Sequence, residues 1–210
     1  MTAVQAELPG DNALARPAAI EKVVAALQRN NVDVRVVETG GDARRLVLEL
    51  VPEGAEVHSG KSKTLEDLGL FRELFESGRY DSVRARTLPM DRKTQGREIR
   101  KLAAAPDYML GSFQAVTEGG DLVVASASAS QLGPYASGAG RLILVVGSQK
   151  IVRDLDEALQ RIDEHVFPYE DRIVRQRLNM GTFIGKVLII RREWIDGRIT
   201  VILVREPVGV

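Results

Sequence analysis

The sequence of 210 residues contains no cysteine, and this absence excludes several kinds of site. Without thiols the chain forms no disulfide framework, no thiolate metal site, no cysteine-ligated iron–sulfur cluster and no cysteine nucleophile. Aromatic residues are scarce, at 5%, and 29 basic residues balance 29 acidic ones, so the net charge is zero. No overall field therefore draws the chain to nucleic acid or to an anionic membrane.

The N-terminal segment lacks a basic region followed by an apolar stretch, so no signal peptide is visible. Residues 122–140 form one uncharged run of membrane-spanning length, but they include four serines, three glycines, a glutamine and a proline. Such a segment is a poor lipid-facing helix. With 44% hydrophobic residues the chain has ample material for a core, and we predict a soluble cytoplasmic protein without a membrane span.

Alternating strand and helix patterns predict an α/β fold. Residues 141–146 are a continuous apolar run, which is typical of a strand buried on both faces. Further strands are predicted at 32–37, 55–57, 107–110, 122–125, 186–190 and 199–204. Helices are predicted from Pro17, over 43–51, from Thr64 through Phe75, over 91–105 and from Asp154. Pro168 is expected to break this last helix, and a second helix is predicted to follow it to Leu178. This order indicates a three-layer α/β/α domain with a mainly parallel sheet over 17–210, after a flexible arm at 1–16.

Ligands of open α/β sheets bind beyond the carboxyl ends of strands, so the loops that follow strands are candidate sites. In the first such loop, Gly60, Lys61, Ser62 and Thr64 precede a helix, and their amide and ammonium groups suit a phosphate or a carboxylate. A P-loop is excluded because Ala55 stands where that motif requires glycine. An anion site and a plain solvated turn both remain open here.

In a second loop Glu118 stands between Thr117 and Gly119, and the glycine lets backbone approach a ligand closely. By spacing alone, an exposed turn with Glu118 in solvent is the favoured interpretation. The third candidate follows a strand and alternates small hydroxyl residues at Ser126, Ser128 and Ser130. This pattern fits the wall of a crowded pocket and a tight helix–sheet contact equally well.

The fourth loop carries Gly147, Gln149 and Lys150 directly after the most buried strand, which slightly favours an anion site over a solvated turn. The two histidines show no metal-binding spacing, and the sequence contains neither a G-x-S-x-G elbow nor a G-x-G-x-x-G turn after a strand. Basic residues cluster over 84–101 without interleaved aromatics. This cluster indicates a solvated helix face or a surface for a protein partner, and we predict no nucleic-acid binding.

Several segments resemble the LUD domain, the lactate-utilisation protein family. They read AVTEGGDLV, RLILVVGSQKIVRDLDEALQRI and GRITVILVREPVG, and VHSGKSKTLEDLGL resembles the segment before that family's first long helix. The resemblance implies a fold related to sugar-phosphate isomerases and CoA transferases. It also implies an accessory role in the oxidation of L-lactate, or a related organic acid, to pyruvate, beside iron–sulfur partner proteins.

The resemblance further implies that the loops around Lys61, Glu118 and Lys150 surround a cleft for a small anionic metabolite or a nucleotide-like cofactor, whose identity stays open. CoA transferases use a glutamate in a Glu–Gly turn as nucleophile, so the first alternative is an acyl-transfer or isomerase-type enzyme that uses Glu118. The second alternative is a non-catalytic scaffold for a redox complex.

At two places this chain departs from the family pattern, and each departure limits which family properties are expected of this chain. Many relatives carry D-G-x-G-N-R where this chain reads SASASQLGP, so the substrate does not transfer. Some relatives also carry a cysteine cluster before the last strands, whereas residues 175–186 contain none, which removes an iron–sulfur or thiolate metal site within this chain.

Overall fold

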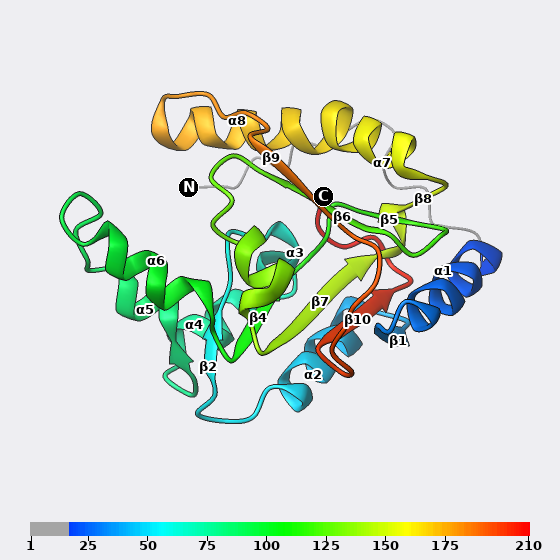
Figure 1. The fold of residues 1–210 in the computed structure, drawn as a ribbon, viewed down its shortest axis with the longest axis horizontal. Helices are drawn as coiled ribbons and strands as arrows, with labels where there is room; N and C mark the ends of the chain where they lie inside the picture. Colours follow the sequence, from blue (N-terminus) through cyan, green and yellow to red (C-terminus); the bar gives the residue numbers. More distant parts are fainter. Residues whose placement is uncertain (1–16) are drawn as a thin grey trace.

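A computed structural model of the chain describes residues 17–210, and at its centre lies a six-stranded sheet (Figure 1). The strands run in the order β1-β10-β7-β4-β2-β3, and every neighbouring pair is parallel. Their bounds are β1 Asp33–Val37, β2 Glu56–His58, β3 Asp81–Ser82, β4 Tyr108–Gly111, β7 Arg141–Gly147 and β10 Ile199–Val204. The arm predicted at 1–16 lies outside the described residues.

Strand β7 shows why the sheet is buried on both faces. Leu142 and Leu144 belong to one hydrophobic core cluster, whereas Ile143 and Val145 belong to a second cluster. Successive side chains of a strand point to opposite faces, so both faces of a central parallel strand read as apolar. The α/β prediction with a mainly parallel sheet is therefore confirmed.

One face of this sheet is covered by helices. They are α2 (Gly40–Leu50), α3 (Lys63–Asp67) and α4 (Leu70–Glu76), while α5 (Val83–Thr87) and α6 (Gly96–Ala104) project beyond the β2–β3 edge (Figure 1). Helix α2 starts earlier than predicted because Thr39 and Asp42 form a capping box at its N-terminus.

A second sheet lies over the other face, beside α1 (Pro17–Arg29) and the short turn η1 (Pro134–Gly138). Its order is β8-β5-β6-β9, with bounds β8 Ile151–Val152, β5 Ala115–Thr117, β6 Leu122–Ser126 and β9 Lys186–Ile190. The outer side of this second sheet packs against α7 (Leu155–Arg161) and the wide turn η3 (Ile162–Val166), and α8 (Phe167–Leu178) continues directly from η3 (Figure 1). The sequence did not predict that this smaller sheet separates the central sheet from its outermost helices.

The helix predicted from Thr64 through Phe75 is instead two helices. Gly69 adopts φ 63°, a left-handed conformation that separates α3 from α4. Ser62 rather than Thr64 caps the first helix, with its side chain accepting a hydrogen bond from the Leu65 amide. Thr64 is thereby left inside the helix, where it is buried.

Pro168 does not end the helix that starts after Asp154. The wide turn η3 immediately precedes α8, and Pro168 occupies the first turn of α8. The first turn of a helix tolerates proline because its missing amide has no partner there.

Farther upstream, the helix predicted from Asp91 begins only at Gly96, since Asp91 accepts hydrogen bonds from the Lys93 amide and the Thr94 hydroxyl in a local turn. Within residues 17–210 no helix is both long and apolar enough to cross a membrane.

Candidate functional site

The loops that follow β2, β4 and β7 meet around Lys150. This lysine is only 2% exposed. Its Nζ donates to Thr64 Oγ1 at 3.0 Å and to Ser112 Oγ at 3.1 Å. Because the carboxyl ends of parallel strands share one edge of a sheet, residues far apart in the chain converge there. The structure thus brings two of the predicted loops, around Lys61 and Lys150, to one place.

The segment after β10 closes over this point. Gln149 Nε2 donates to the carbonyl of Val208 at 3.1 Å, and the Val208 amide donates back to Gln149 Oε1 at 3.3 Å. Gly209 has φ 73°, and a Cβ there would overlap Thr64 Oγ1 and lie 3.0 Å from Lys150 Nζ. Gln149 is therefore a positioning residue, and a glycine is needed where the backbone covers the lysine.

We call the space in front of Lys150 the inner compartment. Its volume is about 60 Å³. Polar side chains dominate its lining, which comprises Ser59, Gly60, Lys61, Ser62, Lys63, Thr64, Ser112, Phe113, Gln114, Val124, Gln131, Tyr135, Lys150, Val166, Glu170 and Val210. All four predicted residues of the first loop lie here. Three lysine ammonium groups beside hydroxyls make this compartment suited to a small anion.

Tyr135 lines the inner compartment, and its backbone is hydrogen-bonded by the arginine of a buried ion pair. Arg198 Nη1 contacts Glu193 Oε2 at 2.6 Å, and the Arg198 guanidinium also donates to the carbonyls of Pro134, Tyr135 and Ala139. Burial raises the pKa of Glu193, but hydrogen bonds from the Ile195 amide and Arg198 outweigh it and hold that pKa below its usual value.

The sequence analysis missed this network because the carbonyls that Arg198 binds lie about sixty positions upstream in the chain. Tyr135 itself stacks at 5.4 Å between ring centroids on Phe113, and burial raises the pKa of its phenol. A Cβ at Gly111 would overlap Tyr135 Oη, so the end of β4 requires glycine for the tyrosine to reach this position.

A larger outer compartment adjoins the inner one. Its volume is about 310 Å³. Ser126, Ser128 and Ser130 line it on the side of β6. The rest of the lining is Lys61, Gln114, Ala125, Ala127, Gln131, Ile162, Val166, Phe167, Glu170, Val174, Thr182, Phe183 and Ile184. The wide turn η3 contributes Ile162 and Val166, in line with the frequent use of such turns at functional sites.

An ion pair stands where the two compartments meet. Lys61 Nζ lies 2.9 Å from Glu170 Oε2, and about a third of each side chain is exposed. Lys61 and Glu170 line both compartments, as do Gln114, Gln131 and Val166. The two spaces are therefore parts of one cleft.

Glu118 lies elsewhere. Its carboxylate pairs with Lys22 of α1 at 3.1 Å, and its amide donates to the carbonyl of Val152. Thr117 is buried and its Oγ1 accepts a hydrogen bond from the Asp121 amide at 2.9 Å, while the Gly119 carbonyl accepts from the Asn30 side chain. Neither compartment is lined by these three residues of the β5–β6 turn.

His58 at the end of β2 is a half-buried titratable group near the cleft loops. Its buried Nδ1 makes no hydrogen bond within the described part of the chain. Burial, and secondly the charge of Arg84, lower the pKa of His58 from 6.5 to about 4. Over residues 17–210 no three side chains of His, Asp or Glu are grouped so as to hold a metal ion.

Comparison with known proteins gives a family and a fold. The family model of the LUD domain matches residues 20–204. No match is found among curated proteins. A similar solved structure is that of a DUF162 family protein from Deinococcus radiodurans, which is 12% identical, with a TM-score of 0.51 over 91% of this chain and 99% of that chain. At this identity the likeness supports the fold alone.

Proposed function

Since the chain belongs to the LUD-domain family, we propose that its cleft binds the carboxylate of a small organic acid and that the protein is accessory to the oxidation of L-lactate or a related acid. The observation that carries the proposal is the convergence of Lys150 and Lys61, from loops after two parallel strands, on one polar compartment. The link to lactate comes from the family resemblance, as do the iron–sulfur partner proteins.

The chemistry of the inner compartment supports a carboxylate ligand. Hydrogen bonds between an ammonium group and a carboxylate are shorter and about twice as strong as neutral ones. Among the hydroxyls around the same space, Thr64 Oγ1 accepts from Lys150 and adds a further donor, whereas those of Ser59 and Ser112 donate to the carbonyls of Gly60 and Phe113. Since Lys150 is buried, its attraction for an anion is screened less than that of a surface lysine.

The test is a thermal-shift screen with L-lactate, pyruvate, CoA esters, NAD, flavins, ATP and sugar phosphates, followed by titration of any ligand that binds. A ligand at about 100 times its Kd stabilises the folded protein by roughly 2.7 kcal/mol. We expect L-lactate or pyruvate to raise the Tm, and Lys150→Met to abolish that shift.

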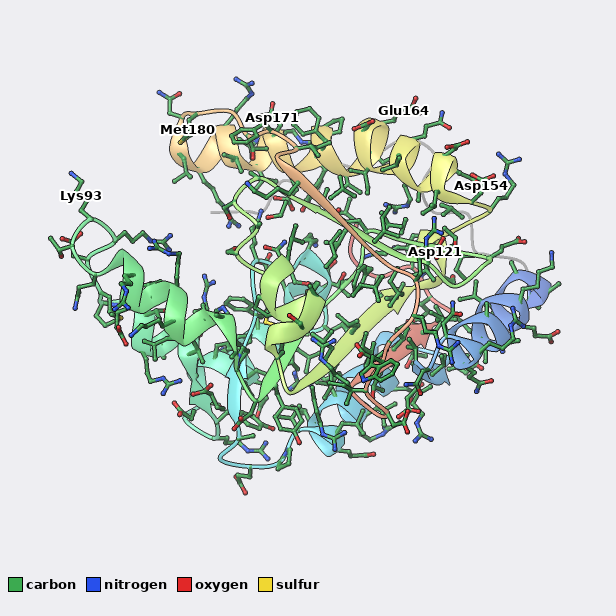
Figure 2. All side chains as sticks on the ribbon, in the orientation of Figure 1. Lys93, Asp121, Asp154, Glu164, Asp171 and Met180 are labelled. Atoms are coloured by element: carbon green, nitrogen blue, oxygen red, sulfur yellow. The ribbon has the colours of Figure 1, made fainter. Side chains whose placement is uncertain are left out.

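Lys93→Met is the matched control, because Lys93 points away from the protein at the tip of the α5–α6 projection (Figure 2). A carboxylate-induced shift that survives in Lys150→Met and Lys61→Met would contradict the cleft assignment. A shift only with CoA esters or sugar phosphates would favour the acyl-transfer or isomerase alternative.

The scaffold alternative has one observation in its favour. Arg92, Lys93 and Arg97 are exposed on the α5–α6 projection, whereas Arg86 in the same basic segment is paired with Glu56 and Asp81. An exposed basic surface suits an acidic face of a protein partner. Capture of partner proteins that is unchanged after charge reversal at Arg92, Lys93 and Arg97 would count against this role.

A further inference from the structure

The two compartments differ in chemistry as well as in size. Hydroxyl and ammonium groups dominate the inner one, of about 60 Å³. The outer one, of about 310 Å³, has a wall of apolar side chains opposite its serines: Ile162, Val166, Phe167, Val174, Phe183 and Ile184. A ligand that fills both spaces therefore has one charged end and one apolar end.

A ligand that fills both compartments is larger than lactate. One water-sized atom needs roughly 10–15 Å³ of such space, so the inner compartment holds about four to six atoms. A carboxylate with its neighbouring carbon and hydroxyl oxygen has this size. A three-carbon acid would leave the outer compartment unused, although its volume falls in the range of about 300–1,000 Å³ found for sites that enclose larger ligands.

From these compartments we propose that the preferred ligand is a 2-hydroxy acid with a bulky apolar substituent, with the carboxylate end in the inner compartment and the substituent in the outer one. This inference rests on the proposed function, because it assumes that the inner compartment binds a carboxylate.

The ion pair at the junction suits such a ligand. Lys61 Nζ and Glu170 Oε2 are 2.9 Å apart and partly exposed. Exposed ion pairs contribute little to stability, so Lys61 exchanges its partner at small cost. An arriving carboxylate accepts from Lys61, and the released Glu170 carboxylate accepts from the 2-hydroxyl group. This exchange favours hydroxy acids over simple acids of the same length.

The experiment compares L-lactate with L-3-phenyllactate, which carries the same hydroxy-acid end and one added phenyl ring, by calorimetric titration of the full chain. We expect L-3-phenyllactate to bind at least tenfold more tightly. Equal affinities, or weaker binding of L-3-phenyllactate, would overturn the extended-ligand inference and leave the proposed function intact.

A pair of variants locates the phenyl ring. Phe183 lines the outer compartment, whereas Leu178 is a neighbouring exposed apolar residue at the end of α8 that lines neither compartment. Figure 2 shows this end of α8 beside the labelled Met180. Phe183→Ala should reduce the tenfold preference for L-3-phenyllactate to threefold or less, and Leu178→Ala should keep it.

The two proposals fail in different ways. A preference lost equally in Phe183→Ala and Leu178→Ala overturns the placement of the ring. Binding of L-3-phenyllactate that is unchanged in Lys61→Met and Lys150→Met overturns the proposed carboxylate site and the inference with it. Absence of binding by both acids overturns both proposals as well.

Discussion

Two turns of this molecule each place a charged side chain beside glycine, yet their surroundings differ. Lys61 follows β2, a parallel strand whose carboxyl end adjoins that of β4, which in turn adjoins β7. Glu118 lies in the turn between the antiparallel strands β5 and β6. Loops after parallel strands share one edge and meet one another, whereas an antiparallel turn is flanked mainly by its own two strands. Similar local sequence therefore produces a cleft in one region and a surface turn in the other.

The ion pairs of the two regions differ in the same way. Arg198 and Glu193, which support the wall of the cleft, have side chains only 2% and 9% exposed. Lys22 and Glu118 are 65% and 32% exposed. Buried and exposed pairs respond very differently to the loss of one partner, so the comparison predicts unequal effects of matched substitutions.

The largest expected effect is that of Arg198→Met. It leaves the Glu193 carboxylate buried without its cation and removes the donors to the Pro134, Tyr135 and Ala139 carbonyls. We expect the free energy of unfolding, measured by urea denaturation at neutral pH, to fall by about 3–5 kcal/mol.

The matched substitution in the other region is Lys22→Met, which removes the cation of an exposed pair. We expect it to change the free energy of unfolding by no more than about 0.5 kcal/mol. Similar losses in Arg198→Met and Lys22→Met would break the comparison.

A second pair of substitutions adds one methyl group in each region. Gly111→Ala would force Tyr135 Oη from its place, whereas the atom nearest to a Cβ at Gly119 is Thr117 Oγ1 at an ordinary 3.6 Å. Overpacking in a well-packed core costs roughly 1–3 kcal/mol. We expect this loss in urea denaturation of Gly111→Ala and a much smaller change in Gly119→Ala; the reverse order would show that the tyrosine is not held as described.

The pH dependence of stability sharpens the account of the loop after β2. The pKa of His58 is lowered from 6.5 to about 4, mainly by burial, so the unfolded chain takes up the proton first as the pH falls. Stability is therefore fully present above pH 6.5 and is lost as the pH drops from 6.5 toward 4. Between about pH 7.5 and pH 5 the protonation of His58 lowers the free energy of unfolding by roughly 2 kcal/mol.

His58→Leu should remove about that much of the loss between the two pH values, as measured by urea denaturation at each. His165→Leu, which removes the chain's other imidazole, is the control. A wild-type slope that persists in His58→Leu, or disappears equally in both variants, would contradict the buried neutral state of His58.

The smallest expected effects concern ligand affinity. Lys61→Met removes one cation from the inner compartment and should weaken binding of L-lactate about tenfold, which corresponds to about 1.4 kcal/mol. Glu118→Gln should leave the affinity within about twofold, because Glu118 lines neither compartment. A strong loss in calorimetric titrations of Glu118→Gln would instead favour the alternative in which Glu118 reacts covalently.

The sequence predicted the elements with clear apolar patterns. Strands β9 and β10 match their predicted bounds, and β1, β6 and β7 differ from theirs by one residue, because an apolar or alternating run can be recognised from the local sequence. Strand β5 was missed because three residues, Ala115–Thr117, are too few to show a period. Two features depend on backbone conformations that composition alone does not specify. They are the separation of α3 from α4 at Gly69 and the position of Pro168 within the first turn of α8.

The candidate site could be predicted from the sequence to the extent that it follows strand ends. Lys61, Thr64 and Lys150 became candidates because each comes shortly after a strand. The outer compartment was found only on its serine side, since Val174 and Phe183 lie on a helix and a loop whose position over β6 depends on the second sheet. Long-range pairs such as Lys61–Glu170 leave no local signal in the sequence.

The central claim is that ligand binds where the loops after β2, β4 and β7 meet. Hydrogen–deuterium exchange of the full chain tests this claim directly. Exchange is compared without ligand and with a saturating concentration of whichever acid binds more tightly, L-lactate or L-3-phenyllactate. We predict slower exchange of backbone amides in residues 59–64, 112–114 and 147–150, with residues 117–121 unchanged. Protection confined to residues 117–121, with those three loops unchanged, would contradict the account.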